Sequence, residues 1–324
     1  MERSELACRA REALAMQSPC RLCPRRCGAR RAAGERGACG EGAAARVYRA
    51  APHRGEEPPL SGVAGSGTVF FSGCTLRCVY CQNHPFSQGG AGEELSAAEL
   101  AGVFLALQAA GCHNLNLVAP THVLPQILQA LERAVGDGFA LPVVYNTSGY
   151  ETPEALRLLD GVADIYLPDL RYADGDAAAR YSGAADYPAF SRRAVREMWR
   201  QVGPLATDAA GIARRGLIVR HLVLPGGVAG TGEVMRFLAE EVSRDVRVSL
   251  MRQYTPCFRA VGDPVIGRRV TRREFDEAVA AMRRAGLSRG WVQEGADEAP
   301  EEFLGESLAP KRAQMRTVRT RNRV

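Results

Sequence analysis

Three closely spaced cysteines are the residues of this sequence best suited to chemistry. Cys74, Cys78 and Cys81 lie within eight residues of one another. They follow an apolar stretch, Thr68–Ser72, which predicts a buried strand running into a cysteine-rich loop. Three thiolates on such a loop can each bind one iron of a cubane cluster, leaving the fourth iron open to a substrate. Gly73 allows the backbone to turn sharply beside the cluster, and we expect one [4Fe–4S] cluster here.

Two simpler interpretations of these three cysteines are alternatives to the cluster. They could form a zinc site, or they could be unrelated thiols. Structural zinc sites take four ligands, usually as paired Cys-x2-Cys units. A spacing of three residues followed by two fits that pattern poorly, so the sequence favours the iron–sulfur cluster.

A second group of cysteines lies nearer the N-terminus. Its four members supply enough thiolates for zinc or for another iron–sulfur cluster, and ligand number does not separate the two. Four free cysteines are the third alternative. This group consists of Cys20, Cys23, Cys27 and Cys39. The other three cysteines, Cys8, Cys112 and Cys257, are expected to have no chemical role.

Short apolar stretches alternate with amphipathic ones from Thr68 onward, which predicts parallel βα units. The expected strands are Thr68–Ser72, Asn114–Val118, Leu141–Asn146, Asp164–Pro168, Leu217–Leu224 and Arg247–Tyr254. The expected helices are Ser96–Ala110, Pro125–Val135, Thr152–Leu159, Pro188–Val202, Gly232–Ser243 and Thr271–Ala285. Six units are too few for a full eight-fold barrel, so we predict an α/β fold with a partial (β/α)6 TIM-like barrel. The loops after its strands should form the active face.

The chain divides into three predicted parts. Residues 1–60 form a small cysteine-rich, metal-binding segment, residues 61–295 form the barrel, and residues 296–324 form a C-terminal extension with a basic, disordered tail. The formal net charge of +6 comes from this tail, because residues 311–324 contain six basic residues and no acid. The rest of the chain has 36 basic and 36 acidic residues. The charge therefore gives little support to nucleic-acid binding.

The sequence contains no apolar run of the roughly 18–20 residues that a membrane span requires. The first 17 residues are charged and lack the apolar centre of a signal peptide. We therefore expect a cytoplasmic protein that does not bind membranes. In a reducing compartment, its cysteines should be metal ligands or free thiols.

The pattern Cys-x3-Cys-x-aromatic-Cys, with Tyr80 as the aromatic residue, resembles the signature of the radical S-adenosylmethionine (radical SAM) superfamily. Longer stretches resemble an uncharacterised branch related to pyruvate formate-lyase activating enzymes. The resemblance extends over roughly residues 19–295. The stretches that carry it are residues 65–83, 114–122, 145–150, 164–172 and 220–226.

The resemblance implies that methionine groups of SAM bind the open iron. It also implies that cluster reduction cleaves SAM to a 5′-deoxyadenosyl radical. Tyr80 resembles the aromatic residue whose loop contacts adenine, and Asp169 resembles an acid near the ribose. Arg220 resembles an arginine that pairs with the methionine carboxylate, which a guanidinium fork suits. Arg171 stands where these enzymes often have lysine. The simpler alternative is that Asp169 and Arg220 only pair with each other.

Two positions depart from the related enzymes. A Gly-Gly-Glu-like motif that contacts the methionine amine is replaced by residues 119–122, Ala-Pro-Thr-His. Thr121 could offer a hydroxyl there, and His122 is expected to start the following helix. Asn146 replaces an aspartate, which puts a monovalent-cation site in doubt.

The leading functional hypothesis is a radical enzyme that abstracts hydrogen, as the activator of a glycyl-radical enzyme. Its reductant would be a low-potential donor such as flavodoxin or ferredoxin. A second hypothesis is radical modification of a small molecule or peptide. A third, from another class, is a zinc–thiolate protein that binds nucleic acid through its arginine-rich ends.

Overall fold

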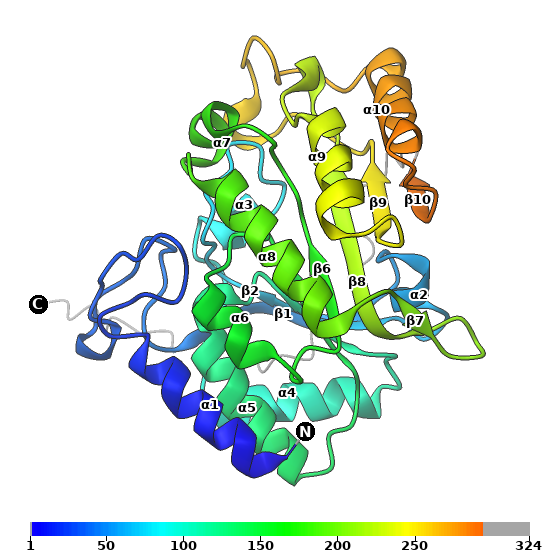
Figure 1. The fold of residues 1–324 in the computed structure, drawn as a ribbon. Coiled ribbons are helices and arrows are strands. Elements are labelled where there is room, and N and C mark those ends of the chain that lie inside the picture. Colours follow the sequence, from blue (N-terminus) through cyan, green and yellow to red (C-terminus); the bar gives the residue numbers. More distant parts are fainter. Residues whose placement is uncertain (1, 294–324) are drawn as a thin grey trace, which may run out of the picture.

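One twisted sheet with helices along it forms the centre of the molecule (Figure 1). The computed structural model describes residues 2–293. The strands are β1 Ala45–His53, β2 Ser66–Phe71, β3 Glu93–Leu95, β4 Leu115–Val118, β5 Val143–Thr147, β6 Ile165–Pro168, β7 Ala206–Thr207, β8 Ala213–Leu222, β9 Arg247–Met251 and β10 Gly290–Gln293. The α-helices are α1 Arg3–Ala15, α2 Pro58–Ser61, α3 His84–Ser87, α4 Ala97–Ala109, α5 Leu124–Gly136, α6 Pro153–Leu159, α7 Gly175–Ser182, α8 Tyr187–Val202, α9 Thr231–Phe237 and α10 Arg272–Arg284.

The six predicted strands are present and are neighbours in the sheet. They follow the order β2-β4-β5-β6-β8-β9, and each pairs in parallel with the next. β10 extends this row in parallel at one end, whereas β1 and β3 extend it antiparallel at the other. Among the described residues the two end strands do not pair, so the barrel is open. The prediction of an α/β partial barrel is confirmed.

The sequence reading missed α1 and β1. α1 is rich in charge, and it buries only Leu6, Ala10 and Ala13, on the side that packs against α5. β1 carries arginines and alanines in place of a clear apolar alternation, and it is held by antiparallel pairing with β2. In both elements tertiary packing outweighs a weak local pattern.

Threonine side chains cap the starts of two helices, α6 and α10. The Thr152 hydroxyl accepts a hydrogen bond from the amide of Ala155, and the Thr271 hydroxyl accepts one from Glu274. The Glu274 carboxylate in turn accepts a hydrogen bond from the Thr271 amide, which completes a capping box. These caps fix where α6 and α10 begin, directly after loops at the carboxyl edge of the sheet.

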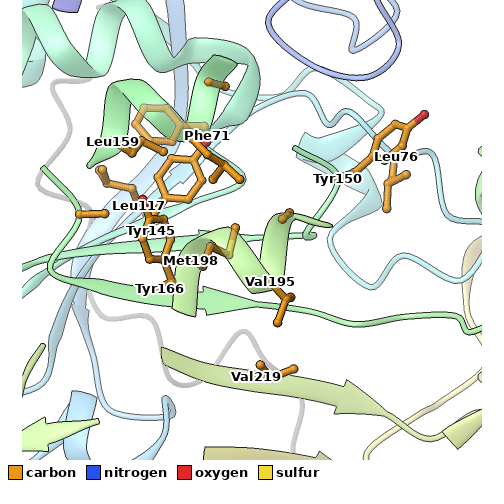
Figure 2. Packing of buried hydrophobic residues seen from close by; sticks show 14 of the residues in the cluster. Phe71, Leu76, Leu117, Tyr145, Tyr150, Leu159, Tyr166, Val195, Met198 and Val219 are labelled. Carbon is orange, nitrogen blue, oxygen red and sulfur yellow. The ribbon is translucent and has the colours of Figure 1, made fainter. Parts of the chain in front are cut away.

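The two faces of the sheet bury different clusters. Leu117, Tyr145 and Tyr166 belong to the large cluster beneath the helices, and Figure 2 shows Leu117 and Tyr145 close to Phe71. A smaller cluster on the opposite, inner face includes Leu60, Val144, Ile165, Leu167 and Ile218. Side chains alternate between faces along a strand. Asn146 and Arg220, two residues beyond Val144 and Ile218, therefore lie on the inner face.

Two further observations bear on the predicted organisation. No helix within residues 2–293 is long and apolar enough to cross a membrane. The predicted C-terminal extension, residues 296–324 with its basic tail, lies outside the described residues.

The outer cluster gives a direct prediction about stability. Leu117 is almost fully buried, so Leu117→Ala should lower the free energy of unfolding by about 2–5 kcal/mol through lost burial and a residual cavity. Chemical denaturation measures this change. Val63, which is 87% exposed, provides the control, since Val63→Ala should shift stability by less than about 0.5 kcal/mol. Equal effects at the two positions would contradict this packing.

Candidate functional site

The predicted cluster cysteines lie on the loop that follows β2, and each sulfur has a polar partner. The amide of Leu76 donates to the sulfur of Cys74. The Ser182 hydroxyl donates to Cys78 Sγ over 2.9 Å, and Ser87 Oγ lies 3.2 Å from Cys81 Sγ. The loop therefore presents three sulfurs already surrounded by hydrogen-bonding groups.

The electrostatics of this loop suit a bound cation. Burial, together with the neighbouring thiols of Cys78 and Cys81, raises the pKa of Cys74 to about 12. Burial also raises the pKa of Cys81. The guanidinium of Arg171 acts in the opposite direction on both groups. Three thiolates therefore repel one another here until positive charge is added, which iron would supply.

The spread of the ligands also distinguishes the kinds of metal site. Within residues 2–293, no group of three His, Cys, Asp or Glu side chains is placed to hold a single metal ion. A cubane binds each thiolate through a different iron, so its ligands need not meet at one point. The donor set at Cys74, Cys78 and Cys81 therefore fits a cluster with three protein ligands.

Gly73 is required by the way this loop turns. Its φ is +80°, a conformation that L side chains rarely adopt. An added Cβ would lie 2.5 Å from Cγ of Glu41 and 2.9 Å from the carbonyl oxygen of Cys39. The cluster loop thus packs directly against the segment that carries the N-terminal cysteines.

Arg220 lies at the centre of a polar layer on the inner face. Its Nε donates to Asp169 Oδ1 over 3.1 Å, and its Nη1 donates to Glu56 Oε2 over 3.2 Å. Its Nη2 donates to the side-chain oxygen of Asn146. Asp169 also accepts from Arg171 Nη2 over 2.6 Å, so it bridges two arginines. The structure thus brings Asp169 and Arg220 together. Their contact is expected both for a SAM-binding pair and for a pair that serves only the fold.

Tyr80 forms part of a buried aromatic wall beside the cluster loop. Its hydroxyl lies 2.6 Å from that of Tyr172, and its ring packs edge-on against Tyr254. Tyr172 in turn lies 2.8 Å from the Ser182 hydroxyl that donates to Cys78. One chain of hydrogen bonds therefore joins the predicted adenine-contacting residue to a predicted cluster ligand.

The segment that replaces the Gly-Gly-Glu motif points its polar groups into the protein. The Thr121 hydroxyl donates to Glu151 over 2.6 Å. His122 lies in the 3-10 turn Thr121–Val123 that leads into α5, and its Nε2 lies 2.6 Å from the carbonyl oxygen of Ser72. Burial lowers the pKa of His122 to about 4, so the imidazole is neutral and supports the backbone next to Gly73.

Sequence reasoning missed Glu56 and Ser182. Glu56 precedes Pro58 in a region assigned to the N-terminal segment, yet it lies against Arg220 on the inner face. Ser182 ends α7, far along the chain from Cys78. Neither residue belongs to a recognisable motif, and both act through contacts that only the fold creates.

A known protein family matches the part of the chain that contains the cluster loop. Residues 68–185 match the family model described as Radical SAM superfamily. Residues 68–185 form a radical SAM domain. Proteins of this family use a [4Fe–4S] cluster together with SAM.

Three further comparisons cover a larger part of the chain. The chain is 29% identical over 245 residues to the uncharacterised protein MJ0674 of Methanocaldococcus jannaschii, covering 72% of this chain and 66% of that one. The FeFe-hydrogenase maturase HydG from Carboxydothermus hydrogenoformans aligns at 15% identity and a TM-score of 0.48, over 72% of this chain and 55% of that one. SuiB of Streptococcus suis, solved with its precursor peptide SuiA, aligns at 10% identity and a TM-score of 0.45, over 69% and 47%. The chain thus spans about two thirds or less of these relatives' lengths.

Glu151 of the radical SAM domain gives a prediction about pH. Burial raises the pKa of this carboxyl to about 7, although hydrogen bonds from Thr121 and Thr147 lower it. A carboxyl whose pKa is higher in the folded than in the unfolded state stabilises the fold below the unfolded pKa. This stabilisation is lost as the pH rises through the folded pKa. Stability should therefore fall by up to about 3 kcal/mol between about pH 4.5 and pH 7.

Glu151→Gln should remove this dependence, because the amide does not ionise. Denaturation midpoints across that pH range measure it. The control is Glu154→Gln, which changes an exposed carboxylate three residues away and should leave the wild-type slope intact. A Glu151→Gln protein that retained the full slope would assign the titration to another group.

Proposed function

We propose that this chain cleaves SAM reductively at a [4Fe–4S] cluster bound by Cys74, Cys78 and Cys81, and that it abstracts hydrogen from a substrate. The observation that carries the proposal is the loop after β2. It carries three sulfurs with hydrogen-bonding partners, and the guanidinium of Arg171, which follows β6, acts electrostatically on Cys74 and Cys81. The bound cluster and SAM would supply the 5′-deoxyadenosyl radical, with electrons from a low-potential donor such as flavodoxin or ferredoxin.

The protein's own groups would bind and orient SAM. A guanidinium has five N–H donors, and those of Arg220 bonded to Asp169, Glu56 and Asn146 fix its plane. The remaining N–H bonds are available for the methionine carboxylate. Asp169, held between Arg171 and Arg220, would accept from the ribose hydroxyls, while Tyr80 would form the wall against adenine.

The proposed substrate is a glycine of a partner protein, as in the pyruvate formate-lyase activating enzymes that the sequence resembles. If a glycyl-radical enzyme is encoded beside this protein, that enzyme is the partner to test. The reconstituted, reduced protein, incubated with SAM and that partner, should produce a glycine-centred radical in electron paramagnetic resonance spectra. The signal should lose its main hydrogen splitting when the partner contains α-deuterated glycine.

The matched control is the same mixture with Cys78→Ala, which should give no radical. If SAM is cleaved and no glycyl radical forms, while deuterium from a small molecule or peptide enters 5′-deoxyadenosine, the activating role is wrong. The substrate would then belong to the second class considered above.

A further inference from the structure

The N-terminal cysteines sit against the radical SAM domain and have contacts of their own. Arg25 Nε donates to the carbonyl of Thr75 over 2.9 Å, on the cluster loop. The amide of Cys74 donates to the carbonyl of Cys39 over 3.3 Å. The two cysteine-bearing loops are therefore joined through their backbones at Cys39 and Cys74.

All four N-terminal sulfurs share one local geometry. Each accepts a hydrogen bond from the backbone amide two residues further along the chain. The donors are Leu22 for Cys20, Arg25 for Cys23, Ala29 for Cys27 and Glu41 for Cys39. Cys74 and Cys81 of the cluster loop accept in the same way, from Leu76 and Asn83. A thiol is a weak acceptor, so an amide aimed at every sulfur suits thiolates.

The four sulfurs also occupy one neighbourhood. Cys20 interacts electrostatically with Cys27 and Cys39, and Cys23 interacts with Cys20 and Cys39. Cys20, Cys23 and Cys39 are buried, whereas Cys27 is exposed. In the described residues the sulfurs do not converge on a single-ion position. They could each bind one iron of a cluster, or a zinc ion could draw them together.

A buried guanidinium faces this group without a carboxylate partner. Arg31 is 2% exposed, and its Nη2 lies 3.0 Å from Cys39 Sγ. Its Nη1 donates to the carbonyl of His122 over 2.7 Å, and its Nε is buried without a partner. Within residues 2–293, no carboxylate forms an ion pair with it. A buried charge is costly unless an opposite charge is near. The Glu41 carboxylate acts on Arg31 electrostatically without an ion-pair contact, and the sulfur of Cys39 is the acidic group that Arg31 contacts directly.

Gly37 lies close to both Arg31 and Cys27. A Cβ at this position would lie 2.9 Å from Arg31 Nη2 and 3.3 Å from Cys27 Sγ. The backbone therefore approaches both the guanidinium and a sulfur as closely as glycine allows. The loop is built tightly around the charged groups, although it contributes little apolar surface.

We propose that Cys20, Cys23, Cys27 and Cys39 bind a second metal centre, a tetrathiolate site whose negative charge is balanced by buried Arg31. The spread of the sulfurs favours an iron–sulfur cluster. A single zinc ion, which the four thiolates also suit by number, would require the sulfurs to move together. Through the Cys39–Cys74 backbone bond, the centre also supports the loop that carries the first cluster. The site does not depend on the radical reaction proposed above.

Removing the first cluster isolates the second centre. The full-length protein with Cys74, Cys78 and Cys81 all changed to Ser, purified without oxygen, should still contain about one zinc, or about four irons with sulfide, per chain. Metal analysis with Mössbauer spectra distinguishes the two metals. A triple variant that is folded by circular dichroism and contains neither metal would overturn the proposal.

The reciprocal variant tests the assignment of ligands. Cys23→Ser with Cys27→Ser should lose that metal while the cluster at Cys74, Cys78 and Cys81 stays loaded. Cys8→Ser, at an exposed cysteine of α1, should change neither centre. Arg31→Gln in the triple variant should release metal to a chelator about tenfold faster or more, because a charge-assisted contact is lost. Unchanged metal content in the double variant, or unchanged release for Arg31→Gln, would count against the site.

Discussion

Cys78→Ala should abolish the SAM-responsive cluster. The wild-type protein, reconstituted and reduced, is expected to give a [4Fe–4S]⁺ signal that shifts when SAM binds the open iron. Cys78 supplies one of three thiolates, and its sulfur is held by Ser182. Without that ligand a second iron lacks a protein donor, so the cluster should not assemble stably. Electron paramagnetic resonance with and without SAM measures the loss, which should be nearly complete.

A second cysteine variant separates this effect from general damage. Cys112 is also buried but packs in the outer cluster away from the loop, so Cys112→Ala should keep the SAM-responsive signal. Total iron alone would be ambiguous because the N-terminal centre could hold iron. A Cys78→Ala protein with the wild-type spectral shift would remove Cys78 from the ligand set.

Arg220→Ala should weaken SAM binding by about 10- to 100-fold, because a charge-assisted carboxylate contact is lost. It should also lower the free energy of unfolding by up to about 3–5 kcal/mol, since Glu56 would lose its cation and Asp169 would keep only Arg171 of its two. Binding is measured by equilibrium titration of the cluster-loaded protein, and stability is measured by denaturation.

A compensated variant tells the two roles of Arg220 apart. Arg220→Met with Glu56→Gln removes one negative charge together with the positive one, so it should recover part of the stability. It should not recover the affinity, because neither new side chain can bind a carboxylate as the guanidinium does. If SAM binds Arg220→Ala as tightly as it binds the wild type, the arginine has only the structural role of pairing with Asp169.

The sequence predicted the barrel because its parallel strands are nearly continuous apolar runs. Strands such as β5 and β6 are buried on both faces, so their composition alone identifies them. β1 and β10 lie towards the ends of the sheet, are only partly buried and carry polar residues, so their sequences resemble loops. Their existence depends on pairing with β2 and β9, respectively.

The residues of the site also fall into two groups: those that the sequence predicts and those that only the fold brings together. Cys74, Cys78 and Cys81 stand out because the chemistry requires three thiolates on one short loop. Glu56 and Ser182 reach Arg220 and Cys78 from distant segments, and no local pattern marks them. Arg31 is one of several arginines near the N-terminal cysteines in the sequence, and only its position in the fold shows that it is buried against a sulfur.

Formation of 5′-deoxyadenosine is the most direct test of the central claim. The full-length protein is loaded with iron and sulfide, reduced with dithionite and mixed with SAM, and the products are separated by chromatography. One electron per SAM should give methionine and a 5′-deoxyadenosyl radical, which without substrate takes a hydrogen atom from the protein or the buffer. The account therefore predicts 5′-deoxyadenosine and methionine in equal amounts from the wild type, and only background from Cys78→Ala. A wild-type protein with a reduced, SAM-bound cluster that released no 5′-deoxyadenosine would contradict the proposed reaction.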